Sequence, residues 1–100
     1  MEALTESYFY ILLCLYEGKN HGYGIMQRTA ELSKKRVKIG SGTMYGAISN
    51  MMKKGWIVEC KTEDSRKRMY QLTTLGTKVM QGECKRLNEL VENIQRITGE

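Results

Sequence analysis

The sequence contains no proline, one histidine (His21) and one aspartate (Asp64). A chain without proline, whose ten glycines stand singly, resembles neither a linker nor a disordered tail. One histidine and one aspartate supply no pair for acid–base or nucleophilic catalysis. The three cysteines lack the C-x-x-C spacing of a zinc or redox site, and no phosphate-loop motif is present. We therefore expect neither an enzyme nor a bound metal or cofactor.

Long hydrophobic runs are also missing. The longest apolar run covers residues 8–16, whereas a membrane-spanning helix needs about 20 residues. No signal-peptide pattern is visible, and an odd number of cysteines is typical of reduced thiols in the cytosol. A length of 100 residues allows one small domain. We expect a cytoplasmic protein that makes no contact with a membrane.

Basic residues are concentrated in the middle of the chain, which has a formal net charge of +5. Residues 1–18 carry three acids and no base, whereas residues 19–61 carry nine bases and two acids. From residue 71 onward the two signs balance. A positive region of this kind is typical of a nucleic-acid-binding surface, although a basic face that only keeps the protein soluble has the same pattern.

Hydrophobic periodicity predicts one helix over residues 4–16 and a second over residues 22–35. His21 precedes the second helix, where we expect it to bond to the backbone. Residues 34–39 alternate between basic and apolar side chains, which predicts a short strand. Ser41 is placed to cap a third helix that ends at Gly55. The apolar stripe of that helix consists of Met44, Ala47, Ile48, Met51 and Met52.

Two more strands are predicted over residues 56–61 and 66–72, with the polar residues 62–65 as the tip of a hairpin. Thr73 or Thr74 would then cap a last helix that reaches about Ile97. This order predicts a mainly α fold with a small β-hairpin: a winged helix-turn-helix in which the hairpin is the wing. We expect a DNA-binding domain over residues 1–73 and a dimerisation helix over residues 74–100.

The third helix and the wing carry the side chains that we expect to contact DNA. The side chains opposite the apolar stripe are mostly short and polar. They are better suited to contact with base edges and phosphates than to a solvent-exposed face held by salt bridges. The structural alternatives are that Tyr45 is a core aromatic and that the lysines at the helix end interact with the helix dipole. The expected DNA-binding residues are Ser41, Thr43, Tyr45, Ser49, Asn50, Lys53, Lys54, Arg66, Lys67 and Arg68.

The last helix is too long for the core of so small a domain. About 24 residues extend roughly 36 Å, and the apolar positions from Met80 onward step by 4, 3, 4 and 3, as in a heptad seam. We therefore expect a homodimer, in which a small-molecule effector could bind between the two long helices. The expected interface residues are Leu4, Tyr8, Met80, Cys84, Leu87, Val91 and Ile94.

Five motifs in unbroken order give the chain a resemblance to a known family. They are Leu13–Gly18, His21–Met26, Gly42–Ile48, Lys54–Ile57 and Arg66–Thr73. Together they resemble the PadR family of bacterial transcription regulators over residues 4 to about 80. The single long C-terminal helix resembles the smaller PadR subfamily, which includes multidrug-sensing repressors.

The resemblance implies a transcriptional regulator that binds double-stranded operator DNA as a dimer. Some drug-binding members carry a tryptophan in the last helix, but residues 74–100 contain no aromatic residue, so that ligand site is not implied here. We expect a sequence-specific repressor that is relieved by a small molecule or another signal. The alternative is a winged-helix interaction module or a nonspecific nucleic-acid binder.

Overall fold

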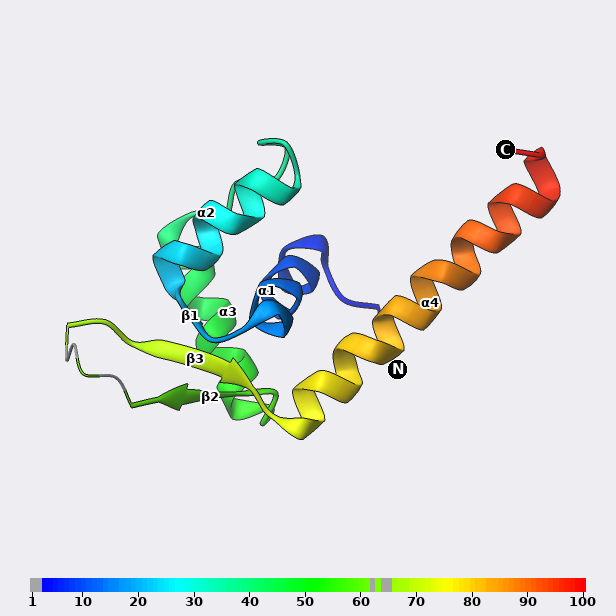
Figure 1. The fold of residues 1–100 in the computed structure, drawn as a ribbon. Helices are drawn as coiled ribbons and strands as arrows, with labels where there is room; N and C mark the ends of the chain where they lie inside the picture. Colours follow the sequence, from blue (N-terminus) through cyan, green and yellow to red (C-terminus); the bar gives the residue numbers. More distant parts are fainter. Residues whose placement is uncertain (1–2, 62, 64–65) are drawn as a thin grey trace.

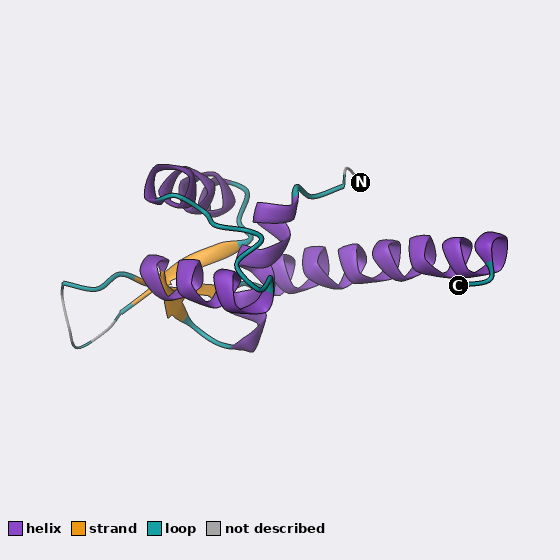
Figure 2. Ribbon diagram, turned by 90° about the horizontal axis from the view of Figure 1, so that it is seen from above, coloured by secondary structure: helices purple, strands orange, loops and turns teal. Residues whose placement is uncertain are grey.

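The computed structural model describes residues 3–61, 63 and 66–100. Its elements, in chain order, are α1 (Glu6–Glu17), β1 (Asn20–His21), α2 (Gly22–Leu32), α3 (Ser41–Lys53), β2 (Ile57–Cys60), β3 (Met69–Leu72) and α4 (Thr74–Thr98). The strands form one antiparallel sheet in the order β1-β3-β2. In Figures 1 and 2, the hairpin and the distal half of α4 leave the helical core in opposite directions.

The core lies where the first three helices meet the sheet and the first turns of α4. Apolar residues at helical spacing place one face of each helix inside this cluster. The largest fully buried side chains include Ile11, Leu12, Ile25, Met44, Ile48, Met51, Ile57 and Met80. The mainly helical winged helix-turn-helix with a long last helix, expected from the sequence, is therefore confirmed.

Side-chain caps define where three of the helices begin. Thr5 accepts a hydrogen bond from the backbone N–H of Tyr8 (3.2 Å) and so caps α1. Thr73 accepts one from the N–H of Gly76 (3.0 Å) and caps α4. His21 caps α2, because its Nδ1 accepts from the N–H of Gly24 at 3.1 Å. The prediction that His21 bonds to the backbone is confirmed.

Four predictions about the elements were wrong. Residues 34–39 form no strand, because Lys34 and Lys35 adopt left-handed φ values of 53° and 66° and turn the chain. This turn ends α2 at Leu32 instead of residue 35. Ser41 does not cap α3: the N-cap is Gly40, which makes no side-chain bond, and Ser41 is the first helical residue. The strand expected over residues 66–72 begins only at Met69.

The sheet has a third strand that the sequence did not indicate. Asn20 and His21 pair with Tyr70 and Met69 on the side of β3 that faces away from β2. The predicted hairpin tip over residues 62–65 lies largely outside the described residues, which include only Glu63 of that segment. The two-residue β1 ties the start of α2 to the base of the wing, and this positions the site described next.

The proximal half of α4 belongs to the winged-helix core. Gly76 lies so close to β2 that a Cβ there would come within 2.0 Å of the carbonyl oxygen of Trp56. Two turns later, Glu83 is only 3% exposed and forms an ion pair with Arg86. The hydrogen bond from Arg86 lowers the pKa of Glu83, and the backbone N–H of Leu4 acts in the same direction. These contacts attach α4 and the N-terminal segment to the same core.

Candidate nucleic-acid interface

The outward face of α3 is smooth and uncharged over most of its length. Burial of Met44, Ala47, Ile48 and Met51 turns the opposite face of the helix to solvent. Residues three or four apart on a helix share a face, so Gly42, Gly46, Ser49 and Lys53 line this outward side, and all four are exposed. The predicted contact residues Ser41 and Thr43 are exposed in the first turn.

Tyr45 lies beside this face and leans on the first residue of α2. A Cβ built on Gly22 would lie 3.1 Å from the hydroxyl oxygen of Tyr45 and equally close to two of its ring carbons. The phenol therefore rests on the backbone of Gly22, while 52% of the residue stays exposed. Tyr45 is not the core aromatic that the structural alternative described.

A notch of about 580 Å³ opens between the first turn of α2, α3 and the base of the wing. The residues that line it are aromatic or basic apart from one glycine: His21, Gly22, Tyr23, Tyr45, Arg66, Lys67, Arg68 and Tyr70. The structure therefore brings the three predicted wing residues and Tyr45 to one place. No acidic residue is among those lining the notch in the described part of the chain.

Asn50 and Lys54 lie on a different side of α3 from the notch. The amide of Asn50 donates to the hydroxyl of Tyr8 at 2.9 Å. The ammonium of Lys54 lies 5.3 Å from the centre of the Trp56 ring, in a cation–π position. All four residues line a groove of about 400 Å³ under the N-terminal segment. The structure thus separates these two predicted DNA-binding residues from Tyr45 and the wing.

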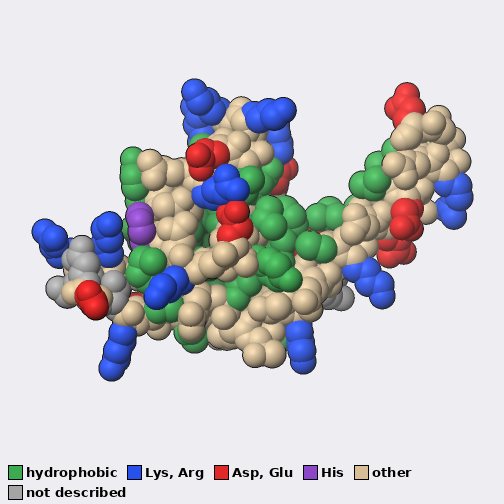
Figure 3. Space-filling model, in the orientation of Figure 1, with side chains coloured by type: hydrophobic (Ala, Val, Ile, Leu, Met, Phe, Trp, Pro, Cys, Tyr) green, Lys and Arg blue, Asp and Glu red, His purple; other side chains and the backbone are tan. Residues whose placement is uncertain are grey.

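Charge is distributed so that the wing stays basic. In Figure 3, Lys and Arg side chains gather around the end of the hairpin and at the far end of α2. Two arginines outside the wing are paired with acids: Arg28 with Glu17 and Arg36 with Glu6. These pairs offset positive charge on the α1 side of the molecule.

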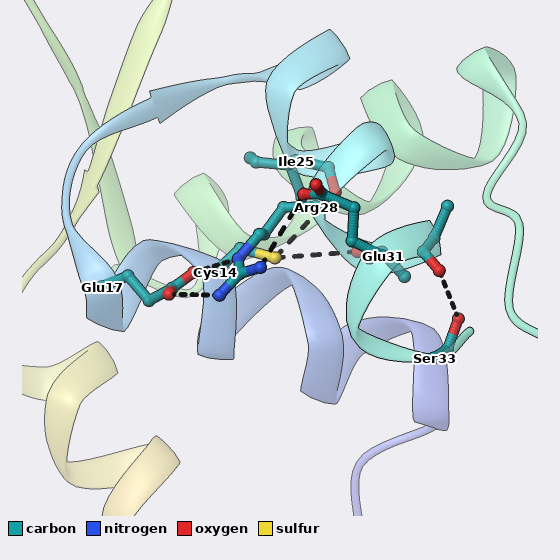
Figure 4. A network of polar contacts seen from close by, with 8 residues as sticks. Cys14, Glu17, Ile25, Arg28, Glu31 and Ser33 are labelled. Atoms are coloured by element: carbon teal, nitrogen blue, oxygen red, sulfur yellow. Dashed lines mark hydrogen bonds and ion pairs between the residues drawn. The ribbon is translucent and has the colours of Figure 1, made fainter. Parts of the chain in front are cut away.

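The Glu17–Arg28 pair also fixes α2 against α1 (Figure 4). Arg28 donates two hydrogen bonds to the Glu17 carboxylate, at 2.9 and 2.8 Å, which lowers the pKa of Glu17 and raises that of Arg28. Beneath it, burial raises the pKa of the Cys14 thiol, which lies 3.7 Å from the Thr29 hydroxyl. This network holds the second half of α2 against α1.

The residues expected at a dimer interface are divided between core and surface. Met80 is 1% exposed and packs inside its own chain, so it does not belong to a free face. Leu4, Tyr8 and Leu87 are half-buried, and Cys84 is exposed. Val91 and Ile94 are 48% and 55% exposed on the distal half of α4.

Sequence reasoning did not indicate the contact between Gly22 and Tyr45 or the Tyr8–Asn50 bond. Gly22 belongs to one of the five motifs, and a glycine at the start of a helix was the available signal that another side chain packs closely there. The Tyr8–Asn50 contact joins residues 42 positions apart, and no periodicity or spacing indicates such a pair. Among the described residues, no group of three His, Cys, Asp or Glu side chains could hold a metal ion. No helix in the described part of the chain is long and apolar enough to cross a bilayer.

The family model of the PadR-like transcriptional regulators matches residues 11–82. No curated protein matches the chain. A transcriptional regulator from Clostridium thermocellum, Cth-833, is 26% identical with a TM-score of 0.79, over 90% of this chain and 87% of that chain. A PadR family regulator from Clostridium difficile R20291 is 21% identical with a TM-score of 0.74, over 94% and 99%. RosR of H. salinarum is similar in fold at 21% identity and a TM-score of 0.67, over 97% and 80%.

Proposed function

Because the chain belongs to the PadR-like family of transcriptional regulators, we propose that it binds operator DNA sequence-specifically as a homodimer and represses transcription until a signal releases it. The observation that carries this proposal is the placement of the smooth face of α3 beside the basic notch of the wing. An α-helix fits the major groove, and Gly42 and Gly46 would let the backbone of α3 approach the base edges. Tyr45 and the basic side chains of the wing would then contact the sugar–phosphate backbone.

Base reading is assigned to Ser49, and the phosphate contacts to Ser41, Thr43, Tyr45, Lys53 and the wing residues 66–68. Ser49 lies on the outward face, with a hydroxyl that can donate or accept. Asn50 has a weaker claim, because its amide donates to Tyr8. We therefore propose that Asn50 and Lys54 support the orientation of α3 from its far side.

Dimerisation is supported by the distal half of α4. A helix of 25 residues extends about 37 Å, and its packing against the core ends near Leu87. Beyond that point four apolar side chains are between 46% and 78% exposed: Leu90, Val91, Ile94 and Ile97. An apolar row of this kind is typical of an interface, and a second copy of the same helix offers the matching row.

Repression and its relief need no further chemistry in this architecture. A dimer that occupies operator DNA excludes other proteins from the same site. Each α4 is continuous from the winged-helix core to the proposed interface, so a change in the angle between the two helices alters the spacing of the two wings. A small molecule bound between the helices, or another signal acting there, would change DNA affinity in this way.

The test is a gel shift on the DNA upstream of the protein's own gene, with random-sequence DNA as competitor. We expect the upstream complex to survive an excess of random competitor, and sedimentation of the free protein to give twice the chain mass. Equal affinity for both DNAs would favour nonspecific binding, and no shift on either would favour a protein-interaction module.

A further inference from the structure

The notch between α2, α3 and the wing is lined by a hydroxyl donor and by a guanidinium. The neutral donor is the Tyr45 hydroxyl, which the contact with Gly22 holds over the start of α2. The cation is Arg68, at the last position before β3. The two groups come from elements more than twenty residues apart in sequence, and both line the same cavity.

Tyr70 lines the same notch as Arg68. Tyr70 is only 3% exposed, and its backbone pairs with Asn20 on one side and Glu59 on the other. Burial raises the pKa of Tyr70 and the Glu59 charge adds to this, while the positive charge of Arg68 lowers it. The exposed guanidinium of Arg68 therefore lies in the wall of the notch beside a buried hydroxyl.

One phosphodiester group can accept from both kinds of donor that line the notch. A backbone phosphate has two unesterified oxygens that share one negative charge, so one can accept from a hydroxyl and the other from a guanidinium. A carboxylate side chain of a protein partner would be held equally well by arginine alone, but the hydroxyl of Tyr45 and the aromatic walls suit a larger group. The cavity of about 580 Å³ admits the phosphate together with part of its sugar.

We propose that the notch seats a single DNA backbone phosphate that Tyr45 and Arg68 contact together, with Gly22 as the residue that positions Tyr45. The proposal rests on the DNA binding proposed above and deepens it. Gly22 acts through Tyr45: a methyl group there would lie 3.1 Å from the phenol and would push the hydroxyl away from the phosphate.

The experiment measures affinity for upstream and random-sequence DNA by fluorescence anisotropy over a range of salt concentrations. Tyr45→Phe should weaken both complexes about tenfold, the loss expected for a hydrogen bond to a charged group, and leave the salt dependence unchanged. Arg68→Ala should also reduce the slope of log K against log salt by ~0.9 for each notch. The double variant should lose less than the product of the two single losses, because both groups hold one phosphate.

Gly22→Ala tests whether Gly22 affects DNA binding by positioning Tyr45 and not by changing the stability of the fold. It should weaken DNA binding in the natural sequence but cause no further loss when Tyr45 is already Phe, while the thermal midpoint stays the same or rises. Tyr16→Phe is the matched control, because Tyr16 is 53% exposed on α1 and lies outside the notch. It should bind DNA like the unmodified protein.

The outcomes distinguish the two proposals. If the unmodified protein binds DNA while Tyr45→Phe and Gly22→Ala bind it equally well, the phosphate seat is refuted and DNA binding stands. Losses that multiply in the double variant also refute the shared seat. If the unmodified protein binds neither DNA, the proposed function fails and the seat fails with it.

Discussion

Replacing Gly46 should raise the stability of the protein and lower its affinity for DNA. Gly46 lies in α3, where its backbone φ is not left-handed, and a Cβ built there meets no atom within 4 Å. In a helix interior, Gly→Ala stabilises by about 0.5–1 kcal/mol, mainly because it restricts the unfolded chain. For a domain of this size, 1 kcal/mol shifts the midpoint by roughly 4–8 °C, so Gly46→Ala should melt about 2–8 °C higher.

The same open space is where DNA should lie. In a major-groove complex the outward face of α3 would contact base edges, and a side chain at Gly46 would stand between the helix and the bases. Leucine is nearly as good a helix former as alanine, so Gly46→Leu should remain folded while its affinity for upstream DNA falls at least tenfold, about 1.4 kcal/mol. Circular dichroism against temperature and anisotropy on labelled upstream DNA measure the two effects.

A second glycine gives the control for stability. At Gly76 the added Cβ would come within 2.0 Å of the Trp56 carbonyl oxygen, a backbone atom that cannot rotate away. Gly76→Ala should therefore destabilise by about 1–3 kcal/mol, as overpacking does. Normal DNA binding by Gly46→Leu would refute the proposal that this face of α3 meets DNA. A lower midpoint for Gly46→Ala would refute the argument from open space.

Three further predictions concern other parts of the molecule. Val91→Glu with Ile94→Glu should convert a dimer to a monomer in sedimentation without unfolding it. Lys85→Gln with Arg96→Gln, which lowers the net charge by the same amount on the opposite side of α4, should leave the dimer intact. A dimer in both variants would show that the distal apolar row is not the interface. Asn50→Ala should remove the bond to Tyr8, cost about 0.5–1.5 kcal/mol of stability and weaken binding to all DNA sequences alike. Ser49→Ala should instead change the base preference at one position. A loss of affinity for selected sequences in Asn50→Ala would show that Asn50 reads a base. The pKa of Glu83 is lowered in the folded state, so the unfolded state binds more protons. This contribution to stability is present above the unfolded pKa near 4.3 and is lost as pH falls through the folded pKa. Glu83→Gln should therefore reduce the pH dependence of the free energy of unfolding in urea between about pH 5 and pH 3, and an unchanged pH dependence would contradict this role of Glu83.

Helix positions were predictable because each helix carries its own evidence. The stripes of α1 and α3 follow the helical period, and the caps Thr5 and Thr73 stand where a hydroxyl can accept from the first turn. The strands were less predictable. The paired part of the hairpin is four residues on each side, and the two-residue β1 exists only because β3 offers it an edge.

The basic wing and the polar face of α3 could be found from charge and spacing, but their grouping could not. Tyr45, Asn50 and Lys54 all lie outside the apolar stripe of α3, and the sequence offers no reason to separate them. The structure separates them because Gly22 accommodates the Tyr45 ring on one side, while Tyr8 and Trp56 hold the other two on the opposite side.

Local periodicity, caps, charge distribution and motif order were sufficient to determine the winged-helix class, the long last helix and the family resemblance. Each of these depends on residues within a few turns of one another, so the chain itself carries the information. Tertiary structure alone decided that Met80 and Glu83 are buried in their own chain, that residues 34–39 turn instead of pairing, and that the wing, Gly22 and Tyr45 form one notch. Those features depend on which distant surfaces meet, and close packing between such surfaces leaves no periodic trace in the sequence.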